Sequence, residues 1–156
     1  MILAIAACST EAPPSVRVKA VPAHADSVVF VAPATAHLCS GGRALLLQAA
    51  DDHGNGALLL LRHGDSLVTA RLPLIALGDS ITPRGANAAF RYMIGDVAHG
   101  LSLDSGTVDL TVSGGALTAR AHGSGLDVGV RVAVDAAYGG VLLPAAADTV
   151  PCRFMP

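Results

Sequence analysis

Alternation of apolar and polar residues runs through the C-terminal third of the chain and constrains its fold more than any other feature. In residues 107–112, Val108, Leu110 and Val112 fall on one face, and Asp109 and Thr111 fall on the other. This period of two is typical of β-strands with one buried face. The same alternation continues in two further runs, residues 116–122 and 127–136. The pattern predicts three consecutive strands.

Glycine-containing segments separate the three runs. Residues 113–115 and 123–125 read Ser-Gly-Gly and Gly-Ser-Gly, and glycine reaches positive φ without steric cost, so both segments predict tight turns. We therefore expect an antiparallel meander. Its third strand would place four valines on one face: Val128, Val130, Val132 and Val134. The charged residues on the opposite faces predict cross-strand ion pairs, and they are Asp109, Arg120, Arg131 and Asp135.

Shorter apolar runs in the N-terminal half predict further strands, at residues 28–32, 44–49, 57–62 and 67–77. The leucines at 58–61 suit a central strand or a short buried helix, and residues 86–98 fit one helix or a strand with a loop. The predicted fold class is all-β: an antiparallel β-sandwich or small β-barrel of about eight or nine strands. A chain of 156 residues predicts one domain, here residues 27–156.

Composition narrows the classes of function. A formal net charge of −2 argues against a nucleic-acid-binding protein, which would carry a basic face. With 52% hydrophobic and 14% charged residues, the chain does not resemble a disordered protein. No apolar run approaches the length of about 18 residues that a membrane-spanning helix needs.

The first residues resemble the end of a lipoprotein signal peptide. Ile5-Ala6-Ala7-Cys8 is similar to the lipobox of bacterial lipoproteins, in which an aliphatic residue and two small residues precede cysteine. The resemblance implies cleavage before Cys8 and a diacylglycerol on its thiol, which would anchor the protein in a membrane of the cell envelope. No Lys or Arg precedes Cys8, whereas signal peptides begin with basic residues, so we expect the natural leader to begin upstream. The alternative is an N-terminus with a buried, unmodified cysteine.

Residues 9–26 contain three prolines and, by composition, predict an extended tether between residues 1–8 and the domain. Two further cysteines, Cys39 and Cys152, remain after Cys8 is assigned to lipidation. An even number of cysteines in an exported protein predicts a disulfide between them, and the alternative is two buried free thiols.

A second resemblance concerns Gly78-Asp79-Ser80-Ile81, which is similar to the first sequence block of GDSL-type (SGNH) hydrolases. Asp96-Val-Ala-His99 resembles the Asp-x-x-His block of that family. The resemblance implies Ser80 as nucleophile, His99 as base and Asp96 as the residue that orients His99. The family fold is a parallel sheet wrapped by helices, and no Asn of this chain is followed by Asp as in the family's oxyanion motif.

The six histidines show no spacing typical of a metal site. His53 with Asp51 and Asp52, or His63 with Asp65, offers donor atoms in a loop, but we expect solvated loop histidines, no metal and no cofactor. The sequence predicts a lipid-anchored cell-envelope protein with a non-enzymatic binding or structural domain, whose protein or small-molecule partner it does not name. The alternatives are a small-ligand carrier with a barrel cavity and a serine esterase that uses Ser80.

Overall fold

The computed structural model describes residues 12–154, which form ten strands and no helix. The strands are β1 (Ser15–Pro22), β2 (Val28–Cys39), β3 (Ala44–Ala50), β4 (Gly56–Arg62), β5 (Ala70–Pro73), β6 (Gly85–Ile94), β7 (Val97–Ser113), β8 (Ala116–Asp127), β9 (Val130–Leu142) and β10 (Thr149–Val150). Within this part of the chain no helix is long and apolar enough to cross a membrane.

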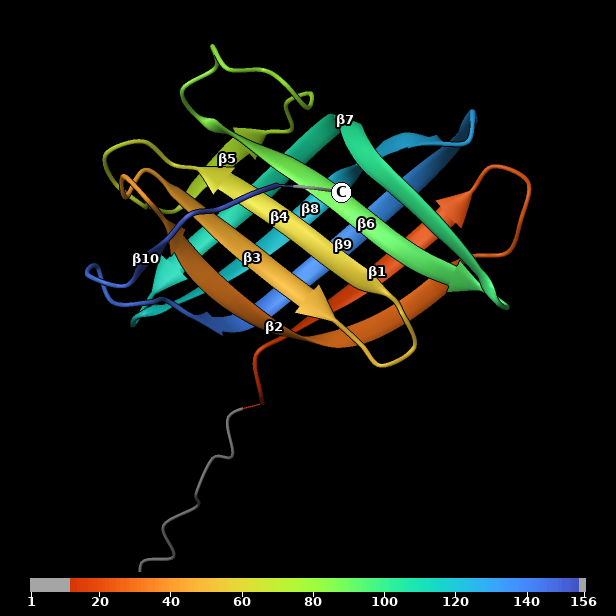
Figure 1. Cartoon of the computed structure of the whole chain (residues 1–156), viewed down its shortest axis with the longest axis horizontal. Coiled ribbons are helices and arrows are strands. Elements are labelled where there is room, and N and C mark those ends of the chain that lie inside the picture. The colour runs from red at the N-terminus through yellow and green to blue at the C-terminus, as the bar shows by residue number, and fades with distance from the viewer. Residues whose placement is uncertain (1–11, 155–156) are drawn as a thin grey trace, which may run out of the picture.

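Eight of the strands close into an antiparallel barrel (Figure 1). The hydrogen-bonded order is β1-β9-β8-β7-β6-β4-β3-β2, and β1 also pairs with β2, so the sheet returns on itself. Closure leaves these eight strands without a free edge. The all-β prediction is confirmed, and of its two architectures the protein adopts the barrel.

Strand β1 corrects the predicted tether. The prolines of this segment predict an extended linker, but residues 15–22 form the strand that closes the barrel. Val16, Val18 and Ala20 are buried, and Arg17 and Lys19 between them are exposed. The alternation that identifies the strands of the C-terminal third is therefore present here as well.

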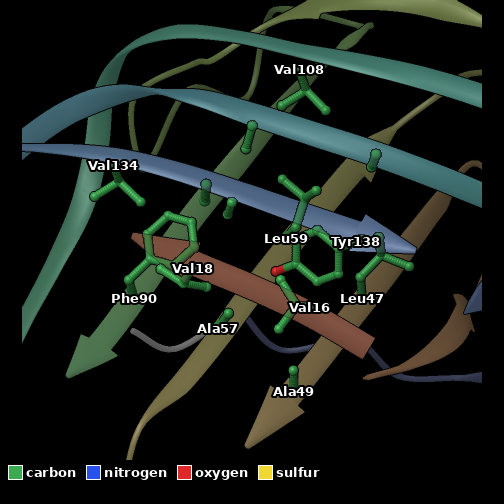
Figure 2. Packing of buried hydrophobic residues seen from close by; sticks show 14 of the residues in the cluster. Val16, Val18, Leu47, Ala49, Ala57, Leu59, Phe90, Val108, Val134 and Tyr138 are labelled. Carbon is green, nitrogen blue, oxygen red and sulfur yellow. The ribbon is translucent and has the colours of Figure 1, made fainter. Parts of the chain in front are cut away.

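Side chains from all eight strands fill the barrel interior (Figure 2). The four-leucine run lies in β4 as a strand, with Leu59 and Leu61 fully buried and Leu58 and Leu60 on the outer face. Many of the inward residues are alanine or valine, which lets the opposite walls approach each other. The rings of Phe90 and Tyr138 occupy the space that remains between the walls.

Tyr138 yields a prediction about stability. Its hydroxyl is fully buried and has no hydrogen-bond partner among residues 12–154, and burial raises its pKa well above the usual value. A buried hydroxyl without a partner costs about 1–3 kcal/mol, so Tyr138→Phe is expected to raise the free energy of unfolding by about 1–2 kcal/mol. Urea denaturation measures the change. The matched control is Tyr92→Phe, which removes a hydroxyl bonded to Asp127 and should destabilise; a loss of stability in both variants would contradict the prediction.

The predicted meander is present as β7, β8 and β9, with two corrections. Gly114 and Gly115 form the β7–β8 turn at positive φ, as expected. Residues 123–125 form no turn, because they lie inside β8 and pair with β7. The β8–β9 turn is instead Val128-Gly129, so Val128 does not share the buried face of Val132 and Val134, and Val130 is only partly covered.

The predicted cross-strand ion pairs form in part. Arg120 and Asp135 pair at 2.9 Å. Asp109 pairs with Arg71 of β5, and Arg131 pairs with Asp104 of β7. These pairs are partly or largely exposed to solvent, which screens their charges, so they contribute little to stability.

Residues 86–98 form no helix; they contribute most of β6, a tight turn and the start of β7. Strand β7 is the longest and changes its neighbour along its length, since residues 97–102 pair with β6 and residues 107–110 pair with the short β5. Figure 1 shows β7 bending sharply between these two parts. Of the run at 67–77, only Ala70–Pro73 is a strand.

The C-terminal segment is fixed to the outside of the barrel. Strand β10 pairs in parallel with the end of β2, and Ser40 donates its backbone N–H to Val150 over 2.8 Å. Cys39 and Cys152 form the expected disulfide, with their Cα atoms 5.2 Å apart. The last described residues cross in front of β3 and β4 in Figure 1.

Candidate functional site

Three polar side chains meet inside one end of the barrel. We call this end the Tyr92 end; it is where β1, β3, β6 and β8 finish and where β2, β4, β7 and β9 begin. Tyr92 and His99 face each other across the β6–β7 pair, and Asp127 is the last residue of β8. All three sit at inward positions of the alternating pattern, so strand register alone brings them together.

The carboxylate of Asp127 holds the cluster together. Its Oδ2 accepts the Tyr92 hydroxyl at 3.0 Å and lies 2.7 Å from Nδ1 of His99. The rings of Tyr92 and His99 stack, with centroids 5.2 Å apart and planes 13° from parallel. Tyr92 and Asp127 are buried, whereas about a quarter of the His99 side chain reaches solvent. Burial, and then the hydrogen bond to Asp127 and its charge, raise the pKa of Tyr92 to about 12, so the phenol stays protonated and donates.

This arrangement presents an imidazole in a fixed orientation. A carboxylate only accepts hydrogen bonds, so Asp127 selects the tautomer of His99 that carries its proton on Nδ1. Nε2 then offers a lone pair, and no group within residues 12–154 donates to it. A His–Asp pair of this kind serves as a general base when a nucleophile stands beside it. Among the described residues, no serine, threonine or cysteine is hydrogen-bonded to His99.

The structure does not bring Ser80 to His99. Ser80 lies in the loop between β5 and β6, where β6 begins, and His99 lies where β6 ends. Ten residues of extended strand, roughly 33 Å, separate these two ends. Asp96 lies in the exposed β6–β7 turn, and the residue that orients His99 is Asp127. The antiparallel barrel also differs from the parallel sheet that the hydrolase resemblance implies.

The Gly-Asp-Ser loop has a local structural explanation. The carboxylate of Asp79 accepts the backbone N–H groups of Ile81 and Thr82, each at 2.9 Å, and the Thr82 hydroxyl at 2.6 Å. These bonds hold the pKa of Asp79 below its usual value, and the bond from the Thr82 hydroxyl contributes most. The side chain of Asn87 fixes the base of the loop by donating to the carbonyl of Ile75 at 2.9 Å. The motif therefore forms a turn that is stabilised by its own side chains.

Because of this geometry, we expect Ser80 not to react as a nucleophile. A fluorophosphonate probe should label the wild type no more strongly than Ser80→Ala, since no base lies beside the hydroxyl. The measurement is the labelled fraction by intact-protein mass spectrometry, with a serine esterase as positive control. Stoichiometric labelling that disappears in Ser80→Ala would show that the loop is an active site.

The two candidate metal groups differ in their surroundings. Donor atoms of Asp51, Asp52 and His53 lie within 4.8 Å of one another in the exposed β3–β4 loop. The carboxylate of Asp51 already accepts hydrogen bonds from the backbone N–H of Asn55 at 2.9 Å and from its side-chain amide at 2.7 Å, which fits a turn-forming role.

His63 and Asp65 do not converge on a common point. The expectation of a solvated loop histidine is wrong for His63, which is buried and whose ring nitrogens have no partner within the described residues. The exposed Asp65 pairs instead with Arg43. Burial lowers the pKa of His63, which favours the neutral imidazole.

A shallow groove of about 880 Å³ lies on the outer face of β3, β4, β6 and β7. Its floor is open because the residues that pair with Arg91 on the two neighbouring strands, Gly56 and Gly100, have no side chains. Leu58 and Leu126 supply apolar walls. The groove is a second surface at which a ligand can be held, and it adjoins the His99 cluster because His99 also lines it.

Comparison of the chain with models of protein families, with curated proteins and with solved structures finds no match. Cys8, the predicted lipidation site, lies outside the described residues.

Proposed function

We propose that the protein is a lipid-anchored cell-envelope protein whose barrel is a non-enzymatic binding module. The observation that carries the non-enzymatic part is the His99 cluster, where an oriented imidazole has no nucleophile bonded to it within residues 12–154. The filled interior of the barrel favours recognition at its outer surface and its ends over enclosure of a ligand. A carrier with a central cavity is thus less well supported than a module that binds at its surface.

The Cys39–Cys152 disulfide supports an exported protein, because such bonds persist in oxidising compartments and are rare in the cytosol. Ile5-Ala6-Ala7-Cys8 supports attachment through Cys8. Since β1 begins at Ser15, only six residues separate Cys8 from the barrel. Fully extended, six residues span at most about 22 Å, so the barrel would lie close to the membrane surface.

The test is Cys8→Ala in a chain expressed with a complete export leader. The wild type should float with membranes in a density gradient, and mass spectrometry of its N-terminal peptide should find a diacylglycerol on Cys8. Cys8→Ala should leave the protein unprocessed or soluble. A wild-type protein that is soluble and carries no acyl chain would overturn the anchor.

A further inference from the structure

The Tyr92 end of the barrel carries exposed apolar side chains on two hairpins that are neighbours in the sheet. The β6–β7 turn exposes Ile94 and Val97, and the β8–β9 hairpin exposes Leu126, Val128 and Val130. We call these five residues the apolar rim. Figure 1 shows both hairpins projecting at the right, at the same end as the β1–β2 loop.

Val128 shows that the rim is maintained at a conformational cost. It is 95% exposed and adopts φ of 45° at the tip of a two-residue turn, with Gly129 at 81°. Turns with positive φ at both positions strongly favour Asn-Gly, and a β-branched residue there is a genuine outlier. An asparagine at this position would expose less apolar surface to water and would relieve the strain. A strained, fully exposed valine is therefore better explained by contact with a partner than by folding.

The charges around the rim indicate the chemistry of that partner. The four loops at the Tyr92 end, residues 22–28, 50–56, 94–97 and 126–130, contain five Asp and no Lys or Arg. Asp26, Asp52 and Asp96 are exposed there. At the opposite end, the β4–β6 connection contains Asp65 and Asp79 together with Arg71 and Arg84, and Arg62 ends β4, so acidic and basic residues are mixed there. The rim is thus an apolar surface within an acidic one, which complements an apolar surface flanked by basic residues.

We propose that the apolar rim and its aspartates form a docking surface for a different protein, one that presents apolar side chains beside Lys or Arg. This inference deepens the proposed function by naming the surface and the partner chemistry of the binding module. A second copy docked by the same end would bring two acidic surfaces together. A second copy docked by its opposite end would leave a free surface at each end of the pair and continue into a filament. An anionic lipid surface is disfavoured by the same aspartates.

The first experiment uses the purified full chain with Cys8→Ser, exported so that the disulfide forms. The probes are fluorescent 12-residue peptides of alternating Lys-Leu, Lys-Ser and Glu-Leu. Only the Lys-Leu peptide should bind well, and Val128→Asn or Val97→Asn should weaken it about tenfold, as expected for a central interface residue. Ile81→Asn is the matched control, because Ile81 is 91% exposed but lies in the β5–β6 loop. Equal losses in Val128→Asn and Ile81→Asn, or equal binding of Glu-Leu, would overturn the proposal.

A stability measurement separates docking from a structural role. Asparagine tolerates positive φ, so Val128→Asn should raise the urea midpoint while it weakens binding. If the substitution lowers the midpoint instead, Val128 supports the fold and the docking proposal is wrong.

The second experiment places a benzophenone amino acid at residue 128 of the lipidated protein in cells, with residue 81 as control. The proposal predicts adducts from residue 128 to one segment of another protein that contains both apolar residues and Lys or Arg. Adducts to the protein itself, to lipid, or at the same level as from residue 81 would refute it. Flotation of the same samples reports on the Cys8 anchor, so failure of the anchor and failure of the docking surface are distinguishable.

Discussion

Replacing Gly123 with alanine is expected to lower the free energy of unfolding by more than about 4 kcal/mol, a loss that few single substitutions reach. A Cβ atom at this position would lie 2.1 Å from the carbonyl oxygen of Ser105 and 2.9 Å from Cδ1 of Leu74. The first neighbour is backbone of the adjacent strand, so it cannot move away without breaking the β7–β8 pairing. Because domains of this size are stable by only about 5–15 kcal/mol, little folded protein should remain under mild denaturant.

The close approach of the β7 and β8 backbones occurs where β7 bends between the part that pairs with β6 and the part that pairs with β5. Gly106 of β7 pairs with Gly123 of β8, and a Cβ at Gly106 would in turn lie 2.1 Å from the carbonyl oxygen of His122. The register shifts between Leu103 and Ser105 in the same region. Glycines on both strands therefore let the two backbones approach at a corner of the barrel.

Urea denaturation of Gly123→Ala beside Gly139→Ala provides the measurement. Gly139 lies in β9, a Cβ atom added there would have no neighbour within 4 Å, and its φ is in the ordinary range. Alanine there should change stability by less than about 0.5 kcal/mol. If the two variants lose equal stability, the loss comes from replacing a glycine within a strand and not from the close approach of the β7 and β8 backbones.

The same glycines show why part of the fold was beyond prediction from sequence. Residues 123–125 have the composition of a turn, and a glycine needed for positive φ is indistinguishable in sequence from one needed for close approach. Whether residues 123–125 turn or pair depends on the path of β7, which also pairs with β6 and β5. Residues 107–112 and 116–122, by contrast, were predictable because local alternation determines both their conformation and their buried face.

The error at β1 has a different cause. Val16, Val18 and Ala20 alternate with charged residues as clearly as the later strands do, but Pro13, Pro14 and Pro22 dominate the composition of the segment. Pro22 ends the strand, and its ring is buried, so proline is compatible with this position. Periodicity is the better guide here because burial acts on individual positions, whereas composition averages over them.

Only part of the His99 cluster can be predicted from the sequence. The resemblance to a hydrolase block identifies His99 as a candidate residue, but it implies Asp96 as the partner, which is close in the chain and not in the site. Asp127 is 28 residues away and reaches His99 only through the β7–β8 pairing. Tyr92 comes into position in the same way, through its register with His99. Contacts of this kind follow from topology and not from local spacing.

Removal of the Cys39–Cys152 disulfide is expected to cost about 4–5 kcal/mol in the free energy of unfolding, because the bond closes a long loop in the unfolded chain. The two cysteines are 113 residues apart in sequence, so the bridge spans most of the barrel. In the folded protein, the bond also holds a segment that has little else to secure it. Strand β10 has two residues, and only two register pairs join it to β2.

The experiment compares the parent chain with the double variant Cys39→Ala/Cys152→Ala, with Cys8→Ser in both so that no other thiol interferes. Urea denaturation should show a lower midpoint and a steeper dependence on denaturant, because the unfolded chain expands when the loop is opened. Hydrogen exchange at the Ser40 amide, which donates to Val150, reports on attachment of the C-terminal segment. It therefore separates that role of the disulfide from its constraint of the unfolded chain. Faster exchange at Ser40 with a stability loss below about 1 kcal/mol would mean that the bond merely fastens the C-terminal segment, and would contradict the role in constraining the unfolded chain.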